Sequence, residues 1–583
     1  MQHRRLMIPA ALVGAAGIAL APAIAEASTA THSAASHSAV SSTLSSSTTK
    51  AVADALAKYA KHYTSSATNS VRLRKANVTS ATSAPNPNLA IQTDAWGFSA
   101  FGIEDDVTAT GLTTGTATIT VNWGDGQTSS TTLSAADAAA GNPAQLQHTY
   151  ATLGDYTITT TANDGQGDTV TNTLASVATA GAEYTPYGPT RILDTRKGIG
   201  ATAAPVAAHN TLKLQVTGAG TAGDTIPSGI TAVVLNVTAV SPTASGFLTV
   251  YGDQDSAGDS VPNPGTSNIN FKANQNVPNL VVVPVGANGV VDIANSSAGK
   301  TQILADVAGY FTPANTNKYV SITPTRILDT RKGTGTGTAM AIPAHGSVTL
   351  TVAGAAGGAI PASGVAAVAM NLTAVSGTAN GVITAYPAGQ SLPTVSNLNY
   401  SANQTIANMA IVPVGTNGQI VFNNNSSGSV ELLADADGYY SSTTTATTAS
   451  AYLPLPMPIR MIDTRNPDSP IPLPGPLATK TPVDIPVSPF SYVTSEVFNA
   501  TVVQGTGNGY LSLYPYNSSS PSAAPTTSNL NYLANQTVPN LTVTSLGYNS
   551  SNSSYDFQIY LGGSGTAQLI LDWFGEFDDN QSS

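Results

Sequence analysis

The chain has no cysteine and little charge of either sign. Its 583 residues include no Cys, 7 His and 9% charged side chains, against roughly a quarter charged in an average protein. Without cysteine there are no disulfides, no thiolate metal ligands, no cysteine nucleophile and no lipoprotein anchor. The few histidines are scattered along the sequence, so we expect no metal site and no cofactor.

Basic residues and long apolar runs are also scarce. The net charge is −11, with 21 Lys and Arg residues, and phosphate binding needs clustered basic side chains. We therefore expect no nucleic-acid partner and no attachment to an anionic membrane surface. No Gly-x-Ser-x-Gly elbow occurs, and Glu is rare in the second half of the chain. These absences favour a protein that is not an enzyme.

Residues 1–27 have the pattern of a secretory signal peptide. Arg4 and Arg5 supply a positive start, and Leu6–Ala21 is apolar but short for a membrane span. Ala23–Ala25 then supplies a small-x-small cleavage site. The alternative is a membrane anchor. We expect a secreted protein, extracellular or at the cell surface, with no membrane insertion after the signal is removed.

Residues 28–90 are rich in Ser, Thr and Ala. A segment with so few large apolar side chains cannot bury a core, so the composition predicts a disordered stalk. Within it, Ala51–His62 could form a few turns of helix, and we interpret this stretch as a transient helix in a linker.

Residues 91–181 change to alternating apolar and polar positions, the period of half-buried strands. Three motifs occur here: Asn122–Gly126 with the sequence NWGDG, His148–Tyr150 with HTY, and Gly154–Tyr156 with GDY. Together they resemble the PKD domain. The resemblance implies an immunoglobulin-like sandwich that acts as a spacer or weak interaction module in extracellular proteins.

The aromatic and glycine residues of these motifs also have a physical explanation. Trp123 and Tyr156 are large enough to fill the core of a small sandwich. Gly124 and Gly126 permit the backbone conformations of a tight turn between two strands.

A hexapeptide that occurs three times organises the rest of the chain. Arg191–Arg196 and Arg326–Arg331 both read RILDTR, and Arg460–Arg465 reads RMIDTR. Recurrence of a charged hexapeptide at nearly equal intervals indicates a triplicated unit, long enough for each copy to be a small domain. The predicted domains are β repeat 1 over 184–313, β repeat 2 over 319–440, a linker over 441–450 and β repeat 3 over 452–577.

Short β-type runs separated by turns fill each repeat, without a helical period. The whole chain is therefore predicted to be all-β, with an antiparallel sandwich or barrel in each repeat. Pro284 and Pro413 occupy the same place in two repeats, inside Val-Pro-Val-Gly. Because proline cannot donate a ladder hydrogen bond, that strand is predicted to lie at a sheet edge or a bulge.

Further blocks recur in register with the hexapeptide. They include Ser-Asn-Leu-Asn-Tyr over Ser396–Tyr400, a following Asn-Gln pair, and Asp-x-x-Gly-Tyr beginning at Asp435. Taken together, the blocks look like a β-rich repeat module of secreted actinobacterial proteins. The resemblance covers Tyr184 to the C-terminus and implies an exported cell-surface or accessory role.

The repeated Asp and second Arg of the hexapeptide are the first candidate ligand-binding residues. A carboxylate beside a guanidinium can grip hydroxyls or carboxylates, and the alternative is an internal ion pair that pins the first strand. In an extended strand Asp194 and Arg196 would share one side and Arg191 the other. The candidates are Asp194, Arg196, Asp329, Arg331, Asp463 and Arg465.

The Asn-rich blocks are the second set of candidates, and the better glycan candidates. Amides can pair with sugar hydroxyls while an aromatic ring offers a face for stacking, and the alternative is hydrogen bonding to neighbouring turns and strands. The candidates are Asn268, Asn270, Phe271, Asn397, Asn399, Tyr400, Asn529, Asn531 and Tyr532.

The sequence as a whole favours a secreted, non-catalytic, multivalent binding or adhesion protein. Triplication suits binding, because linked weak sites gain avidity, and the expected partner is extracellular polysaccharide or cell wall. The alternatives are a self-associating matrix or surface-layer component, and an accessory protein with an unrecognised hydrolase site. Repeat 3 departs most from the others, with Trp573 and two extra prolines, so binding is least expected of this repeat.

Overall fold

The computed structural model describes residues 60–74, 86–255, 258–443, 448–520, 523 and 525–581. The predicted signal peptide over 1–27 and most of the predicted stalk lie outside these residues. Strands make up nearly all the regular structure, which confirms the all-β prediction. The one α-helix of the described residues is α2 (Ala135–Ala140), and it is too short to cross a membrane.

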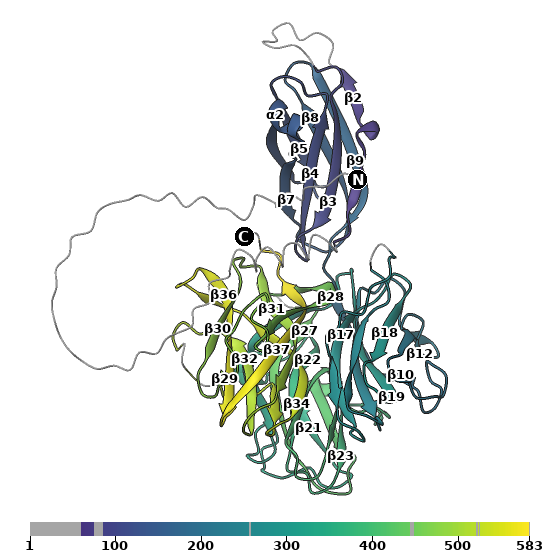
Figure 1. Ribbon diagram of the computed structural model, residues 1–583, viewed down its shortest axis with the longest axis vertical. Helices are drawn as coiled ribbons and strands as arrows, with labels where there is room; N and C mark the ends of the chain where they lie inside the picture. Colours follow the sequence, from purple (N-terminus) through teal and green to yellow (C-terminus); the bar gives the residue numbers. More distant parts are fainter. Residues whose placement is uncertain are drawn as a thin grey trace, which may run out of the picture.

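The first domain, here the N-terminal sandwich, consists of two antiparallel sheets ordered β1-β3-β4-β7 and β2-β9-β8-β5-β6 (Figure 1). Its strands are β1 (Tyr63–Ser65), β2 (Val71–Arg74), β3 (Ala90–Gly97), β4 (Gly102–Thr110), β5 (Thr116–Asn122), β6 (Thr128–Ser134), β7 (Ala144–Thr149), β8 (Asp155–Asn163) and β9 (Asp168–Ala178). Trp123 and Tyr150 are buried between the sheets, and Tyr156 stacks on Tyr150 with ring centroids 3.7 Å apart. Gly124 adopts a positive φ of 86° in the turn after β5, as the glycine of the motif predicts.

Part of the predicted stalk belongs to this sandwich, which corrects the boundary at residue 90. β1 pairs with β3, and β2 pairs with β9, so each strand adds an edge to one sheet. Arg72 of β2 forms an ion pair with Asp168 at 2.5 Å. Strands of three and four residues are too short to give a recognisable alternation, and only their pairing with distant strands makes them regular.

Each repeat folds as a two-sheet sandwich, called module 1, 2 or 3. Module 1 contains β10 (Glu183–Asp194), β11 (Thr211–Gln215), β12 (Gly220–Thr221), β13 (Asp224–Thr225), β14 (Ala232–Val240), β15 (Gly246–Gly252), β16 (Ile269–Phe271), β17 (Val277–Pro284), β18 (Val290–Asn295) and β19 (Gln302–Thr312). Module 2 contains β20 (Lys318–Asp329), β21 (Ser347–Thr351), β22 (Val365–Val375), β23 (Gly381–Pro387), β24 (Leu398–Tyr400), β25 (Ile406–Pro413), β26 (Gln419–Asn424) and β27 (Glu431–Ser441). Module 3 contains β28 (Ala451–Asp463), β29 (Leu477–Ala478), β30 (Val483–Ser488), β31 (Val493–Val503), β32 (Gly509–Pro515), β33 (Leu530–Tyr532), β34 (Thr537–Ser545), β35 (Gly547–Asn549), β36 (Ser554–Gly563) and β37 (Thr566–Asp578).

The three modules share one topology. The inner sheets are ordered β10-β19-β14-β17, β20-β27-β22-β25 and β28-β37-β31-β34, and the outer sheets β11-β18-β15-β16, β21-β26-β23-β24 and β30-β36-β32-β33. The strands that carry Pro284 and Pro413 are edge strands, as predicted. Module 3 adds β29 and β35 at the sides of its two sheets. Each module has its own apolar core between its sheets.

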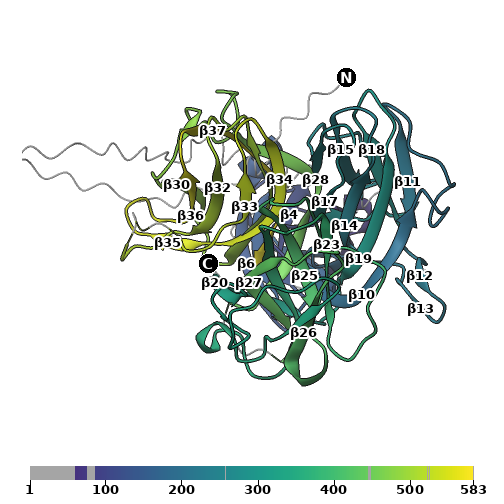
Figure 2. The same cartoon turned by 90° about the horizontal axis from the view of Figure 1, so that it is seen from below.

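The inner sheets of all three modules also enclose a core that belongs to none of them alone (Figures 1 and 2). Two buried aromatic side chains per module meet there in a closed cycle. The pairs are Tyr184–Tyr440, Tyr319–Phe577 and Phe311–Tyr452, with ring centroids 4.2, 4.3 and 4.8 Å apart. Each pair joins two different modules, so the modules form one fused body rather than three beads on a string.

The N-terminal sandwich sits on one end of this fused body (Figure 1). Phe101 packs in an apolar cluster with Ala451 and Leu453 at the start of β28, and the Lys318 ammonium at the start of β20 lies 5.1 Å from the Phe101 ring centroid. The backbone N–H of Ala100 donates to Asp578 Oδ2 at 2.8 Å. The first strands of modules 2 and 3 therefore start beside the sandwich and run away from it.

Candidate functional site

The predicted Asp–Arg pairs form closed ion pairs within each module. Arg196 donates through Nε and Nη2 to the two oxygens of Asp194, at 2.9 and 2.8 Å. Arg331 binds Asp329 in the same way at 2.9 and 2.8 Å, and Arg465 binds Asp463 at 2.8 and 2.7 Å. Hydrogen bonding to the guanidinium lowers the pKa of each aspartate below its usual value. The three aspartates are buried, so the carboxylates are not available to a ligand.

The first arginine of the hexapeptide lies on the same side of the strand as the aspartate, contrary to the expectation for a regular strand. The pairing of β10 with β19 shifts register between Arg191 and Leu193, and such a bulge reverses the side to which later residues point. Arg191 Nη1 therefore lies 3.6 Å from Asp194 Oδ2. Its Nε and Nη2 donate to Asp306, at 2.7 and 2.9 Å. The internal ion pair, one of the two alternatives at the hexapeptide, is present in the structure.

The first Asn of each Asn-rich block is buried and serves its own module. Asn268 Oδ1 accepts the backbone N–H of Val250 at 2.7 Å, and Asn397 and Asn529 accept the equivalent N–H groups of Ala385 and Leu513 at 2.7 and 2.6 Å. In each outer sheet, these bonds fix the start of the short edge strand (β16, β24 or β33) onto the neighbouring strand. The alternative of local hydrogen bonding holds for these three amides.

The remaining members of the Asn-rich blocks do not form an exposed glycan platform. The rings of Phe271, Tyr400 and Tyr532 are buried in the module cores, so they offer no face to a sugar in this structure. The second amides are half-buried, and each has a buried Oδ1 with no hydrogen-bond partner in the described residues. These amides are Asn270, Asn399 and Asn531.

A different set of six asparagines joins the modules, and we call it the Asn ring. The side-chain amide of Asn279 donates to Asn499 Oδ1 at 2.8 Å, that of Asn408 to Asn236 Oδ1 at 2.9 Å, and that of Asn540 to Asn371 Oδ1 at 2.9 Å. Each bond crosses from one module to another, and together they link module 1 to 3, 3 to 2 and 2 to 1. All six side chains are buried.

Backbone groups complete the Asn ring. The N–H groups of Leu280, Met409 and Leu541 donate to Asn408, Asn540 and Asn279 Oδ1 at 3.3, 2.9 and 3.2 Å, each in another module. The amides of Asn236, Asn371 and Asn499 in turn donate to the carbonyls of Ser396, Ser528 and Ser267. Buried amides that satisfy each other in this way fix how the modules dock.

A contact between modules through these asparagines was not predicted from the sequence. A signal was present, because each of these positions is an asparagine inside an otherwise apolar strand and recurs in all three repeats. A buried amide needs a partner, but nothing in one repeat says that the partner lies in another.

The second arginine of each hexapeptide lies at the end of the fused body that is remote from the N-terminal sandwich. We call this end the end face. β10, β20 and β28 start beside the sandwich and finish at Asp194, Asp329 and Asp463. The arginines two residues later stand in the turns beyond the strands. Their side chains are 40%, 41% and 43% exposed, in the order Arg196, Arg331 and Arg465.

Among the described residues, no three His, Asp or Glu side chains lie together in a way that could hold a metal ion. Of the histidines in these residues, His148 is hydrogen-bonded to Asp125 at 2.8 Å beside the buried Trp123 ring, where it completes the packing of the N-terminal sandwich.

No protein-family model matches the chain, and no curated protein matches it. Solved structures with some similarity include one from Sulfolobus turreted icosahedral virus, described as its atomic structure, with 10% identity, a TM-score of 0.15 and coverage of 65% of this chain and 86% of that chain. Another is described as the triple jelly roll fold and turret assembly of an archaeal virus, with 9% identity, a TM-score of 0.15 and coverage of 69% and 91%. Scores this low carry no argument about this protein.

Proposed function

We propose that this chain is an exported, non-catalytic binding protein whose fused body attaches to an extracellular carbohydrate or cell-wall polymer through the end face. The observation that carries the proposal is the presence of three equivalent, half-exposed guanidiniums there, each held by a buried aspartate. Nε and Nη2 bind the aspartate, which leaves the outer Nη1 group to donate to hydroxyls or carboxylates. A guanidinium that is already fixed loses little side-chain entropy on binding.

Multivalency follows from the rigidity of the body. The Asn ring and the shared aromatic core fix the three arginines relative to one another. A polymer that carries the same group repeatedly can engage more than one of them, and linkage of weak contacts raises affinity by roughly 10²–10⁴. Three copies on one rigid face therefore suit a repetitive ligand such as a polysaccharide.

The N-terminal sandwich, which resembles the PKD domain, acts in this proposal as a spacer. It occupies the opposite end of the body, so it leaves the end face uncovered (Figure 1). Attachment through the end face would then hold the N-terminal part of the chain away from the bound polymer.

Retention of the full chain on insoluble cell wall and polysaccharide tests the proposal. We expect retention, and we expect the double variant Arg196→Ala/Arg331→Ala to bind at least tenfold more weakly. The matched control is Lys197→Ala/Lys332→Ala, which removes the same charge from exposed neighbouring residues and should bind like the parent. Absence of retention, equal loss in both double variants, or concentration-dependent self-assembly by light scattering would each contradict the proposal.

A further inference from the structure

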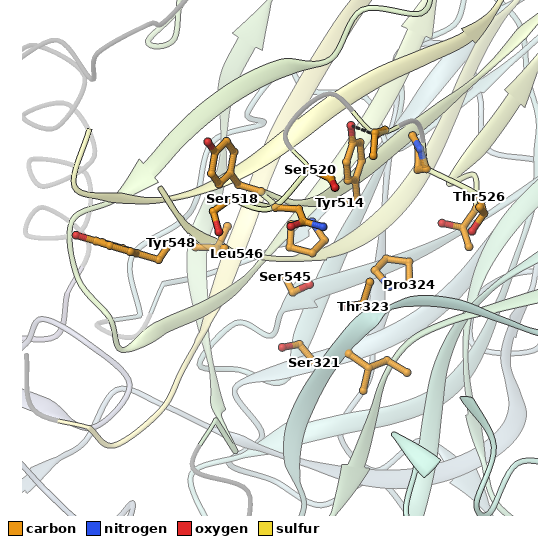
Figure 3. Close-up of a pocket in the computed structure, with 18 residues that line it drawn as sticks. Ser321, Thr323, Pro324, Tyr514, Ser518, Ser520, Thr526, Ser545, Leu546 and Tyr548 are labelled. Atoms are coloured by element: carbon orange, nitrogen blue, oxygen red, sulfur yellow. Dashed lines mark hydrogen bonds between the residues drawn. The ribbon is translucent and has the colours of Figure 1, made fainter. Parts of the chain in front are cut away.

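A groove of about 800 Å³ lies between modules 2 and 3 (Figure 3). One side is Ser321–Pro324, in the irregular part of β20. The other side comes from the end of β32, from the end of β34 with the start of β35, and from described residues that follow β32. These last include Tyr516, Asn517, Ser518, Ser520, Thr526 and Thr527. Its volume falls within the range of about 300–1,000 Å³ that is usual for pockets holding small organic ligands.

The lining of the groove is uncharged and rich in hydroxyl groups. None of the described residues that line it is Asp, Glu, Lys, Arg or His. Serine and threonine hydroxyls occur on both sides, with Ser321 and Thr323 facing the side that carries Ser545 and Thr526 in Figure 3. An uncharged lining gives no attraction to a phosphate, sulfate or carboxylate, and hydroxyls together with amides suit a ligand that is itself rich in hydroxyl groups.

Three tyrosines supply aromatic surface to the groove, beside aliphatic side chains such as Ile322 and Leu546. Tyr514 and Tyr516 are half-buried, and Tyr548 is 51% exposed. Tyr548 is backed by Tyr555, with ring centroids 5.2 Å apart, so its position is supported on one side. Tyr548 takes no part in the apolar core of module 3, so packing alone does not account for it.

Two of these tyrosines occur in module 3 only. At the position of Tyr516 the other modules have Asp253 and Ala388, and at the position of Tyr548 they have Ala287 and Thr416. Tyr548 lies on β35, which pairs with β36 beside the outer sheet. Module 3 therefore carries a local addition that places an aromatic residue at the edge of the groove, and in Figure 3 the Tyr548 ring extends outward from the other labelled residues.

We propose that this groove is a binding site for a neutral glycan segment. The C–H face of a pyranose ring packs on the exposed tyrosine rings, and Asn517, Ser518 and Ser321 hydrogen-bond to its hydroxyl groups. The groove is a separate site from the end face and does not depend on it. The proposal gives a ligand class to module 3, the module of which the sequence led us to expect binding least.

Isothermal titration of the full chain with cellohexaose, maltohexaose, mannohexaose and xylohexaose tests the assignment. We expect at least one to bind, with an affinity that changes less than twofold between low and high salt because the groove is uncharged. Tyr548→Ala should weaken that binding at least tenfold, and Tyr548→Phe should retain it, since stacking needs the ring and not the hydroxyl. The exposed position of Tyr548 means that its truncation leaves the fold intact, which circular dichroism checks.

The controls separate this proposal from the end-face proposal. Arg196→Ala/Arg331→Ala should leave the titration unchanged, and Tyr548→Ala should leave wall retention through the end face largely in place. Binding that is insensitive to Tyr548→Ala would overturn the groove assignment while the end-face proposal stands. Binding of a proline-rich peptide in place of every glycan, or no binding of any of the four oligosaccharides, would also overturn the groove assignment.

Discussion

The contacts between modules are made by residues that recur in all three repeats, whereas the groove between modules 2 and 3 includes residues found in one repeat only. The Asn ring uses residues that occur in all three repeats, and so do the buried aspartates that the first arginines bind. The groove instead has Tyr516 and Tyr548, which occur in one repeat. The first region is buried and the second is partly exposed.

This difference shows why some residues recur in every repeat and others do not. A closed body with three equivalent interfaces needs the same residue three times, because each side chain serves a partner in the next module. A side chain that only one module needs is free to differ. In this chain most of the repeated buried polar residues hold the modules together. Residues that are unique to one module are the better guide to surfaces with a special role.

The largest effect is expected from removing one member of the Asn ring. Asn408→Ala would leave Asn236 Oδ1, the Asn397 carbonyl and the Leu280 N–H without a partner in a buried interface. Each unpaired group costs about 1–3 kcal/mol, so we expect a loss of about 4 kcal/mol in the free energy of unfolding, measured by chemical denaturation. Exposed Asn210→Ala is the control, with a change below about 0.5 kcal/mol. Equal effects would show that the ring does not hold the modules.

A slightly smaller effect on stability is expected at a pair of buried glutamates that only module 3 has. Glu576 pairs with Glu496 across β37 and β31, where modules 1 and 2 pair tyrosine with valine. Burial raises the pKa of Glu576 from 4.5 to about 7, and burial and the neighbouring Glu576 charge also raise that of Glu496. Asp578 lies on the same strand beside the N-terminal sandwich, and Trp573 Nε1 donates to Glu496.

The sign follows from the raised pKa. Between pH 4.5 and 7 the unfolded chain loses the Glu576 proton while the folded protein keeps it, so the free energy of unfolding falls as pH rises. Glu576→Gln removes this titrating group. Between pH 4.5 and 7 we therefore expect the free energy of unfolding of the variant to fall by about 3 kcal/mol less than that of the parent. Denaturation curves at the two pH values measure it. Parallel losses in both proteins would contradict the expectation.

A buried aspartate that only module 2 has lies in the shared core, and its removal should stabilise the protein. Asp437 occupies the position of Ala308 and Phe574, is buried, and has an Oδ2 without a partner in the described residues. Burial raises its pKa well above the usual value. Asp437→Ala should therefore raise the free energy of unfolding at pH 7 by about 2 kcal/mol. The gain should be smaller at pH 4, where the folded carboxyl is neutral and the unfolded one is only partly ionised. A loss of stability at pH 7 would mean that the carboxyl has a partner that stabilises the body.

The smallest effect on stability is expected at the groove. Tyr548→Ala should change the free energy of unfolding by less than about 0.5 kcal/mol, because the ring is largely exposed and lies outside the apolar core. Thermal unfolding beside the parent checks this. A large loss would assign Tyr548 to the fold of module 3 and weaken the contrast between the groove and the Asn ring.

Much of the fold could be predicted from local pattern. The recurring hexapeptide and short alternating runs predicted all-β modules, which begin and end close to the predicted bounds of the repeats, and Pro284 indicated an edge strand. Docking of the modules could not be predicted. An asparagine in an apolar strand looks the same whether its partner lies in its own module or in the next, and the bulge after Arg191 depends on pairing with β19.

The central claim is that the three modules form one body closed by the Asn ring. Native-state hydrogen exchange at Leu280, Met409 and Leu541 tests it most directly, because each amide donates to an asparagine of another module. We predict that the three amides exchange together, at the free energy of opening of the whole body. Exchange at three different free energies, with one module opening while the others stay protected, would contradict the account.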